Sequence, residues 1–97
     1  MLKKNINYID FDGNERNETF HFNLTKAEVA EMEMSTDGGL SKMLEKIVET
    51  NDSKRIIEVF KDLILRSYGE KSPDGKRFVK SQELRDGFSQ TEAYSEL

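Results

Sequence analysis

Hydrophobic and polar residues alternate in the first quarter of the chain, which is typical of strands that bury one face. Ile6 and Tyr8 alternate with asparagines, and Phe20 and Phe22 alternate with polar residues in the same way. The sequence DGNE lies between these two stretches and favours a tight turn, because glycine tolerates positive φ and Asp and Asn favour turns. The pattern therefore predicts a β-hairpin over residues 4–24.

The period then lengthens to that of amphipathic helices, and residues 25–69 are expected to form a helical core. Thr25, with Glu28 three residues later, forms a capping-box signature ahead of the first helix, KAEVAEMEM. Asp52 or Ser53 can cap the third helix. Its apolar stripe extends beyond one face, so we expect it to be the central and most buried helix. The second helix has the clearest helical spacing, with apolar residues at Leu40, Met43, Leu44, Ile47 and Val48.

The remainder of the chain is predicted to form a loop followed by short helices. Gly69 is well placed to end the third helix, and the sequence PDG within residues 70–80 predicts a polar loop with a tight turn. Over residues 81–97, Ser81 can cap one short helix. A second capping box, formed by Ser89 and the glutamate three residues later, precedes TEAYSEL.

Taken together, these elements predict a single α+β domain over residues 1–97. It is mostly helical, with a small N-terminal β-hairpin followed by a bundle of three to five helices. A length of 97 residues is typical of one domain, and a composition with 35% hydrophobic and 35% charged residues indicates a modest core beneath a well-solvated surface.

The chain lacks the residues that several classes of function need. The chain has no cysteine and one histidine, His21, on the polar face of a predicted strand, so we expect no metal site. The sequence DFDGNE has its glycine two positions too early for an EF-hand. No phosphate-binding loop, nucleophile elbow or dinucleotide fingerprint is present. We therefore expect no catalytic residues, no cofactor and no enzymatic activity.

Charge and hydropathy argue against nucleic acid and membranes as partners. The formal net charge is −4, and the basic residues late in the chain are interleaved with acidic ones. No apolar run approaches the roughly 18 residues of a membrane span. The methionines Met32, Met34 and Met43 lie near the junction of the first two helices. They suit either an adaptable recognition surface or the filling of gaps in a small core.

The C-terminal third, SYGEKSPDGKRFVKSQELRDGFSQTEAYSEL, resembles the tail assembly chaperones of long-tailed, siphovirus-type phages and prophages of Gram-positive bacteria. The phrase YGEKSPDGKRFVKS, followed by TEAYSEL, is the most specific part, and the order of elements agrees along the whole chain. Members typically continue past this point with a further apolar helical stretch. We therefore expect this chain to be trimmed, or to be a member that lacks the last segment.

The resemblance implies binding of the tape-measure protein and recruitment of the major tail protein, the subunit of the tail tube. It also implies action in the bacterial host cytoplasm and absence from the mature virion. The alternatives are a structural tail or head–tail connector protein and a prophage-encoded regulatory or inhibitor module. An exposed hairpin edge can pair with a second copy of the chain, so a homo-oligomer is a further alternative. The expected partner-binding residues are Met32, Met34, Leu40, Met43, Leu44, Ile47, Tyr94 and Leu97.

Overall fold

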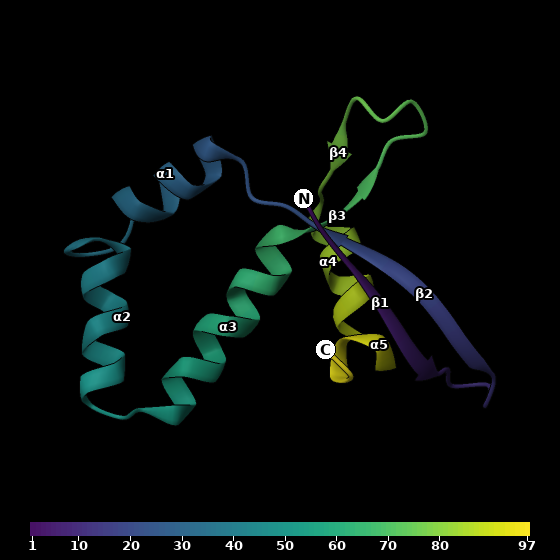
Figure 1. The fold of residues 1–97 in the computed structure, drawn as a ribbon, viewed down its shortest axis with the longest axis horizontal. Helices are drawn as coiled ribbons and strands as arrows, with labels where there is room; N and C mark the ends of the chain where they lie inside the picture. The colour runs from purple at the N-terminus through teal and green to yellow at the C-terminus, as the bar shows by residue number, and fades with distance from the viewer. The chain divides into compact units, whose positions relative to one another are not determined.

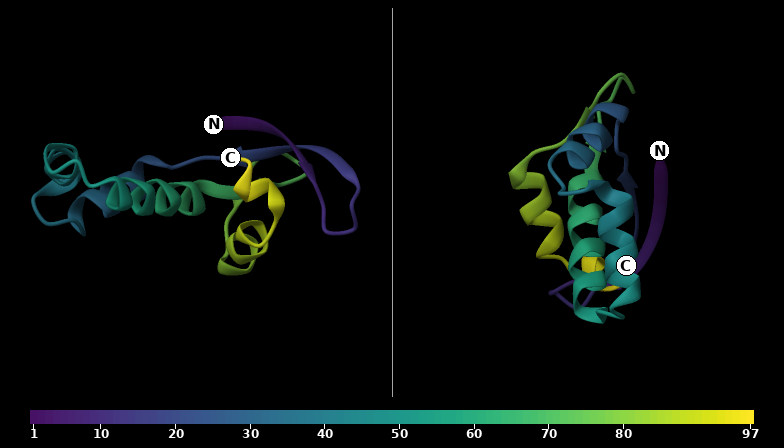
Figure 2. Two further views of the ribbon diagram at one scale, coloured as in Figure 1. Left: turned by 90° about the horizontal axis from the view of Figure 1, so that it is seen from below. Right: turned by 90° about the vertical axis from the view of Figure 1, so that its left-hand side faces the viewer.

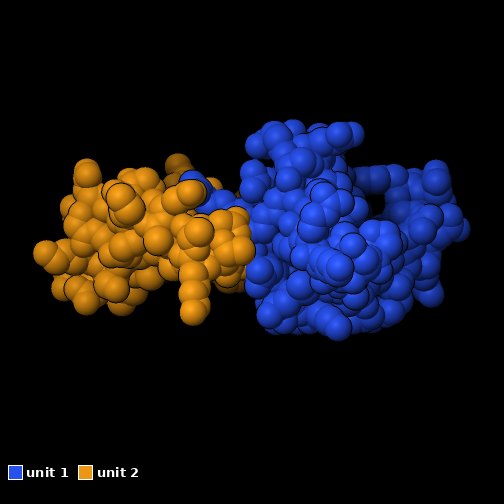
Figure 3. Space-filling view, turned by 90° about the horizontal axis from the view of Figure 1, so that it is seen from above, with its two compact units in different colours: residues 1–23, 65–97 blue, residues 24–64 orange.

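The structure, a computed structural model that describes residues 1–97, contains four strands and five helices (Figure 1). It is α+β with an N-terminal β-hairpin and 48% helix, which confirms the predicted fold class. The chain divides into two compact units (Figure 3). Unit 1 comprises residues 1–23 and 65–97, and unit 2 comprises residues 24–64. The expected set of three to five helices is therefore shared between two units.

The N-terminal hairpin of unit 1 consists of β1 (Leu2–Ile9) and β2 (Glu15–Phe22), paired antiparallel along their full length. The two strands twist together, as strand pairs of L-residues do (Figures 1 and 2). Asp10 organises the turn, because one of its carboxylate oxygens accepts the backbone N–H groups of both Asp12 and Asn14 at 2.9 Å. The hairpin occupies residues 2–22, close to the predicted 4–24.

A second short hairpin replaces the loop that we expected over residues 70–80. Here β3 (Tyr68–Lys71) pairs with β4 (Phe78–Val79), and β3 also pairs with β2, which gives the strand order β1-β2-β3-β4. The predicted turn is present between them. Ser72 is buried, and its hydroxyl donates to Asp74 and accepts the backbone N–H of Arg77. The strands are too short to give a periodic sequence signal, which explains why they were missed.

Gly69 does not end α3 (Ser53–Ser67) in the way that we expected. The helix stops at Ser67, and Gly69 lies in β3 opposite His21, without a positive φ. A Cβ atom at this position would lie 2.6 Å from the carbonyl oxygen of Val79. The absence of a side chain therefore permits the close approach of β4, and it is not needed for a helix cap.

Aromatic rings form the core of unit 1, where α4 (Gln82–Ser89) and α5 (Glu92–Ser95) pack near the sheet. Phe88 of α4 is 3% exposed and lies at the centre of the cluster. It contacts four other rings, which belong to Phe20, Phe22, Tyr68 and Tyr94. Aromatic rings bury a large apolar area each, so this cluster supplies much of the packing in unit 1.

Both helices of unit 1 begin at a side-chain cap. Ser81 accepts the backbone N–H of Leu84 and caps α4, as predicted. The N-cap of α5 is Thr91, which accepts the N–H of Tyr94, so the cap that we expected at Ser89 is wrong. The Ser89 hydroxyl instead donates to a carbonyl within α4. Because α4 extends through Ser89, this residue is not available to start a second helix.

Unit 2 contains α1 (Lys26–Met34), α2 (Gly39–Glu49) and most of α3. The capping box at the start of α1 is complete. The Thr25 hydroxyl accepts the N–H of Glu28, and the Glu28 carboxylate accepts the N–H of Thr25. Asp52 caps α3 by accepting the N–H of Arg55 at 3.1 Å. These local signals confirm the predicted starts of α1 and α3.

The core of unit 2 is small. Its buried apolar residues are Met32 of α1 and Ile47 of α2, and α1 packs against α2. No residue of α3 is buried, so the expectation that this helix would be the central and most buried one is wrong. A hydrophobic stripe shows that a helix face prefers burial, but it does not supply the element that would cover it.

Candidate functional site

Part of the apolar stripe of α3 faces solvent. Ile56, Ile57 and Phe60 are 44%, 55% and 59% exposed. Their spacing of three and four residues places Ile56 and Ile57 one helical turn before Phe60. Fully burying a side chain of this size is worth about 1.5–3 kcal/mol. Leaving three of them in water on one helix therefore marks a face that gains free energy when another surface covers it.

The other two helices of unit 2 also expose apolar side chains. Met34, at the end of α1, is 87% exposed, and Val48 of α2 is 70% exposed. Leu44 lies one turn before Val48 on α2 and is also exposed. We use the term apolar surface of unit 2 for the exposed residues of all three helices, namely Val29, Met34, Leu44, Val48, Ile56, Ile57 and Phe60.

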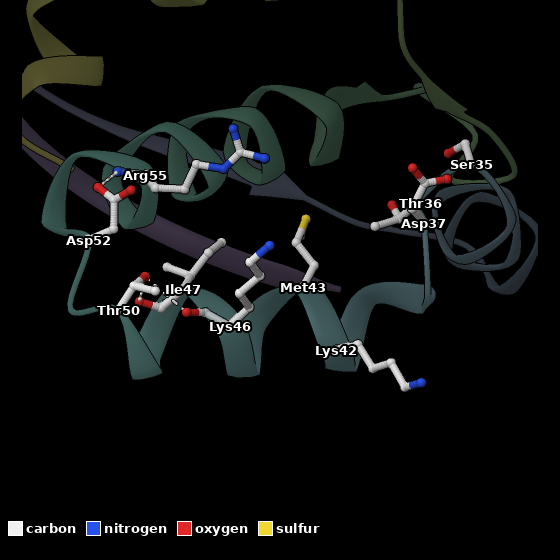
Figure 4. Close-up of a pocket in the computed structure, with 10 residues that line it drawn as sticks. All are labelled: Ser35, Thr36, Asp37, Lys42, Met43, Lys46, Ile47, Thr50, Asp52 and Arg55. Carbon is white, nitrogen blue, oxygen red and sulfur yellow. Dashed lines mark hydrogen bonds between the residues drawn. The ribbon is translucent and has the colours of Figure 1, made fainter.

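Unit 2 also contains an open groove with a volume of about 730 Å³. Figure 4 shows Met43, Lys46 and Ile47 projecting from α2 toward α3, and Arg55, which also lines the groove, lying along α3. The lining runs from the end of α1 to the start of α3 and consists of Ser35, Thr36, Asp37, Lys42, Met43, Lys46, Ile47, Thr50, Asp52 and Arg55.

The hydroxyl groups that line the groove donate hydrogen bonds to backbone carbonyls of α1 and α2. The Thr36 hydroxyl donates to the carbonyl of Met32 at 2.7 Å, and the Thr50 hydroxyl donates to the carbonyl of Lys46 at 2.9 Å. The Ser35 hydroxyl also donates to a helix carbonyl. The Ser35 and Thr36 hydroxyls thus bond the Met32 carbonyl near the end of α1. The Thr50 hydroxyl adds a second hydrogen bond to the Lys46 carbonyl, which already accepts the backbone N–H of Thr50. The groove therefore has a mostly polar lining with two apolar side chains, Met43 and Ile47, and the protons of its hydroxyl groups are engaged.

The structure separates the residues expected to bind a partner. Met43 and Ile47 line the groove. Met34 and Leu44 are among the exposed residues of unit 2, whereas Met32 lies in its core and Leu40 is half-buried.

The two expected residues at the end of the chain belong to unit 1. The ring of Tyr94 meets that of Phe88 edge-on at 5.6 Å between centroids, so Tyr94 serves the aromatic core. Leu97 is 37% exposed.

Sequence reasoning missed the most exposed apolar residues of α2 and α3. Phe60 lies on α3, which was expected to be the most buried helix, and Val48 was placed on the apolar face of α2 but not among the expected binding residues. Ile56 and Ile57 were missed for the same reason as Phe60. The signal that could have found them is the width of the α3 stripe, which extends beyond the one face that a helix at the edge of a small unit can bury.

The charged groups of unit 1 organise its hairpin. Arg16 pairs with Asp10 at 2.5 Å and holds the pKa of that carboxyl below its usual range. The hydroxyl of Tyr8 donates to Glu18, and this hydrogen bond raises the pKa of the Tyr8 phenol. Each contact joins neighbouring residues of the same hairpin, so these shifts report local structure. No three His, Asp or Glu side chains converge as metal ligands would.

None of the helices combines the length and the hydropathy that crossing a bilayer requires. No curated protein and no solved structure matches the chain. A family model described as phage tail assembly chaperone matches residues 1–97, the whole chain. The exposed helical surface agrees with a role in binding other proteins. The chain belongs to the family of phage tail assembly chaperones.

Proposed function

We propose that this chaperone binds the tape-measure protein through the apolar surface of unit 2 and keeps it soluble until the tail assembles around it. The observation that carries the proposal is α3, an amphipathic helix of 15 residues with no buried residue. A long helical client exposes apolar stripes of its own before assembly. An amphipathic helix laid against such a stripe removes apolar area from water on both sides.

The proposal extends to recruitment of the major tail protein, the tail-tube subunit, and to release before the virion is complete. This places the protein in the bacterial host cytoplasm and outside the mature particle. The family's part in tail assembly supports these steps. The family is not a known class of enzymes, and the apolar surface of unit 2 offers packing for a protein partner.

The test is co-expression with the tape-measure protein of the same gene cluster, followed by measurement of soluble and co-purified tape measure. Phe60→Glu places a charge in the α3 stripe. Phe11→Glu makes the same change at the hairpin turn of unit 1, where the side chain is 77% exposed. Both side chains are largely in water, so neither change opens a cavity in a core.

We expect the wild type and Phe11→Glu to keep the tape measure in the soluble fraction. Phe60→Glu is expected to lose most of the co-purified client, because burying one uncompensated carboxylate costs several kcal/mol. Circular dichroism of each variant checks that the helices are retained. Equal recovery of the client with both variants would show that α3 is not the contact surface. Insoluble client with a folded wild type would refute the proposed function.

A further inference from the structure

The sheet of unit 1 ends on one side at a long strand that has no partner along its outer edge. β1 is the first strand in the order β1-β2-β3-β4, and its eight residues pair with β2 on one side only. The strand at the opposite edge, β4, has two residues. Unpaired backbone groups on a long edge strand readily pair with another strand. The outer edge of β1 is therefore the part of the sheet best suited to bind a second chain.

The register of the hairpin identifies the backbone groups that point outward from β1. Where the ladder meets the turn, the N–H of Asp10 donates to the carbonyl of Asn14. Hydrogen-bonded pairs alternate along an antiparallel ladder, so the even-numbered residues of β1 direct their backbone groups toward β2. The N–H and C=O groups of the odd-numbered residues point away from β2. These residues are Lys3, Asn5, Asn7 and Ile9.

We propose that two copies of this chain pair antiparallel along β1, with the two-fold axis at Ile6. In this register Lys3 lies opposite Ile9 of the second copy, and Asn5 lies opposite Asn7 of the second copy. The outward-facing residues of both copies then all hydrogen-bond one another. A shift by two residues in either direction would place one of them opposite the turn or the first residue of the chain, so this register satisfies the edge most completely.

Carboxylates gather near the C-terminal end of β1. An open pocket between this end of the hairpin and α5 is lined by Glu15, Glu92 and Glu96. The one cation among its lining residues, Arg16, is paired with Asp10. The pocket is therefore acidic, and it lies at the end of β1 that the N-terminal half of an antiparallel second copy would meet.

The proposed register brings a cation to this pocket. Lys4 lies opposite Tyr8 of the second copy, and Tyr8 lines the pocket of that copy. The ring of Tyr8 contacts that of Phe20, which packs against Phe88 of α4, so Tyr8 lies on the helix-covered face of the sheet. Lys4 is on the same face and has no ion-pair partner in its own chain. Parallel pairing would instead place the lysines of the two copies side by side, so charge favours the antiparallel dimer.

A second copy fits this edge better than the proposed client does. A helical client satisfies its own backbone groups and gains no hydrogen bonds from a strand edge. A second copy supplies an edge of the same length with the same outward-facing residues. All residues of the proposed contact belong to unit 1, so the inference goes beyond the proposed function, which uses the apolar surface of unit 2.

The first test measures the mass of the full chain against concentration by sedimentation equilibrium. Two paired strands bury a small area, so we expect a dimer with a dissociation constant in the micromolar range. Hydrogen exchange of the backbone amides in the same samples locates the contact. Dimerisation should slow exchange at the odd-numbered residues of β1 and leave the even-numbered ones unchanged. A chain that stays monomeric at millimolar concentration, or a dimer without this alternating protection, would overturn the inference.

A proline substitution tests the backbone contact directly. Asn7→Pro removes an outward-facing N–H that β2 does not use, so the hairpin should be retained. The two-fold axis removes this hydrogen bond twice, and we expect the affinity of the dimer to fall by at least about tenfold. Asn7→Ala is the matched control, because it removes the side chain and keeps the N–H. Near-ultraviolet circular dichroism of the aromatic cluster checks the fold of both variants. Equal affinity of these two variants would contradict pairing along β1.

Charge reversal tests the register and does not depend on the proline variant. Lys4→Glu should weaken the dimer by about tenfold, because like charges replace opposite ones at two symmetric contacts. Adding Glu92→Lys and Glu96→Lys to this variant should restore most of the affinity. Lys26→Glu makes the same charge change at an exposed position of unit 2 and should leave the affinity nearly unchanged. Equal weakening by the two single variants, or no recovery in the triple variant, would refute the proposed register.

Discussion

The ring of Phe88 stacks on the ring of Tyr68, with centroids 4.3 Å apart and planes only 8° from parallel. Tyr68 is the first residue of β3, and Phe88 belongs to α4, so this contact joins the sheet of unit 1 to its C-terminal helices. Burial of Tyr68 also raises the pKa of its phenol.

Removal of the central ring should therefore be costly. Phe88→Ala is expected to lower the free energy of unfolding by about 3–5 kcal/mol, because the change leaves a cavity among four rings. Urea denaturation followed by near-ultraviolet circular dichroism measures this loss. Phe11→Ala, at an exposed position, should change stability by less than about 0.5 kcal/mol. Similar losses in the two variants would mean that the aromatic cluster does not hold unit 1 together.

The capping box of α1 gives a second prediction. Thr25→Ala removes the hydroxyl that accepts the N–H of Glu28 and should destabilise unit 2 by about 1 kcal/mol. Thr25→Ser keeps the hydroxyl and should recover most of that loss. Hydrogen exchange of the amides in the first turn of α1 provides a local measurement. Unchanged protection in Thr25→Ala would show that the cap does not set the start of the helix.

Two glycines should respond in opposite directions to the same substitution. Gly69→Ala places a Cβ atom 2.6 Å from the carbonyl oxygen of Val79 and is expected to destabilise the protein by about 1–3 kcal/mol. Gly87 lies within α4 with no atom within 4 Å of a Cβ, so Gly87→Ala should stabilise the helix by about 0.5–1 kcal/mol. Thermal melts of the two variants should shift to either side of the wild type. Shifts in the same direction would contradict the close approach at β4.

The stability of the hairpin should fall in acid. The Arg16 guanidinium and the N–H groups of the turn lower the pKa of Asp10 below its ordinary value of 3.8. A carboxyl whose pKa is lower in the folded state contributes its full stabilisation above the unfolded pKa. It loses that contribution as the pH falls through the folded pKa. Asp10→Asn should be less stable than the wild type at neutral pH, and the difference should shrink below about pH 4.

Urea midpoints measured for both proteins across this range provide the check. A difference between wild type and Asp10→Asn that stays constant with pH would show that the Asp10 charge does not stabilise the turn. Asp74 also has a lowered pKa, through the hydroxyl of Ser72, and therefore adds acid sensitivity to both proteins equally.

Local signals in the sequence predicted local structure well. Thr25, Asp52 and Ser81 cap the helices as expected, since a cap needs only a side-chain oxygen and an N–H three residues or so away. Burial of α3 could not be read in the same way, because it depends on which element covers the helix. The short strands β3 and β4 were missed because their pairing is fixed by contacts with each other and with β2.

The candidate site was also predictable only where its residues share one helix. The spacing of Met43 and Ile47 correctly placed both residues on one face of α2, and the structure shows that this face lines the groove. The contribution of Arg55 comes from a different helix. One chain pattern contains no information about which side chains of two helices line the same groove, so the lining of this groove became visible only in three dimensions.

The division of the chain has a consequence for biosynthesis. Unit 1 is discontinuous, and the pairing of β2 with β3 joins segments separated by all of unit 2. Contacts of such sequence separation form slowly, whereas the turns of α1, α2 and α3 need only neighbouring residues. As the chain leaves the ribosome, the helices of unit 2 therefore emerge before Phe88 does. The nascent chain therefore exposes the apolar side chains of unit 2 before the aromatic cluster of unit 1 can form. During this interval the exposed helices can associate with other nascent chains.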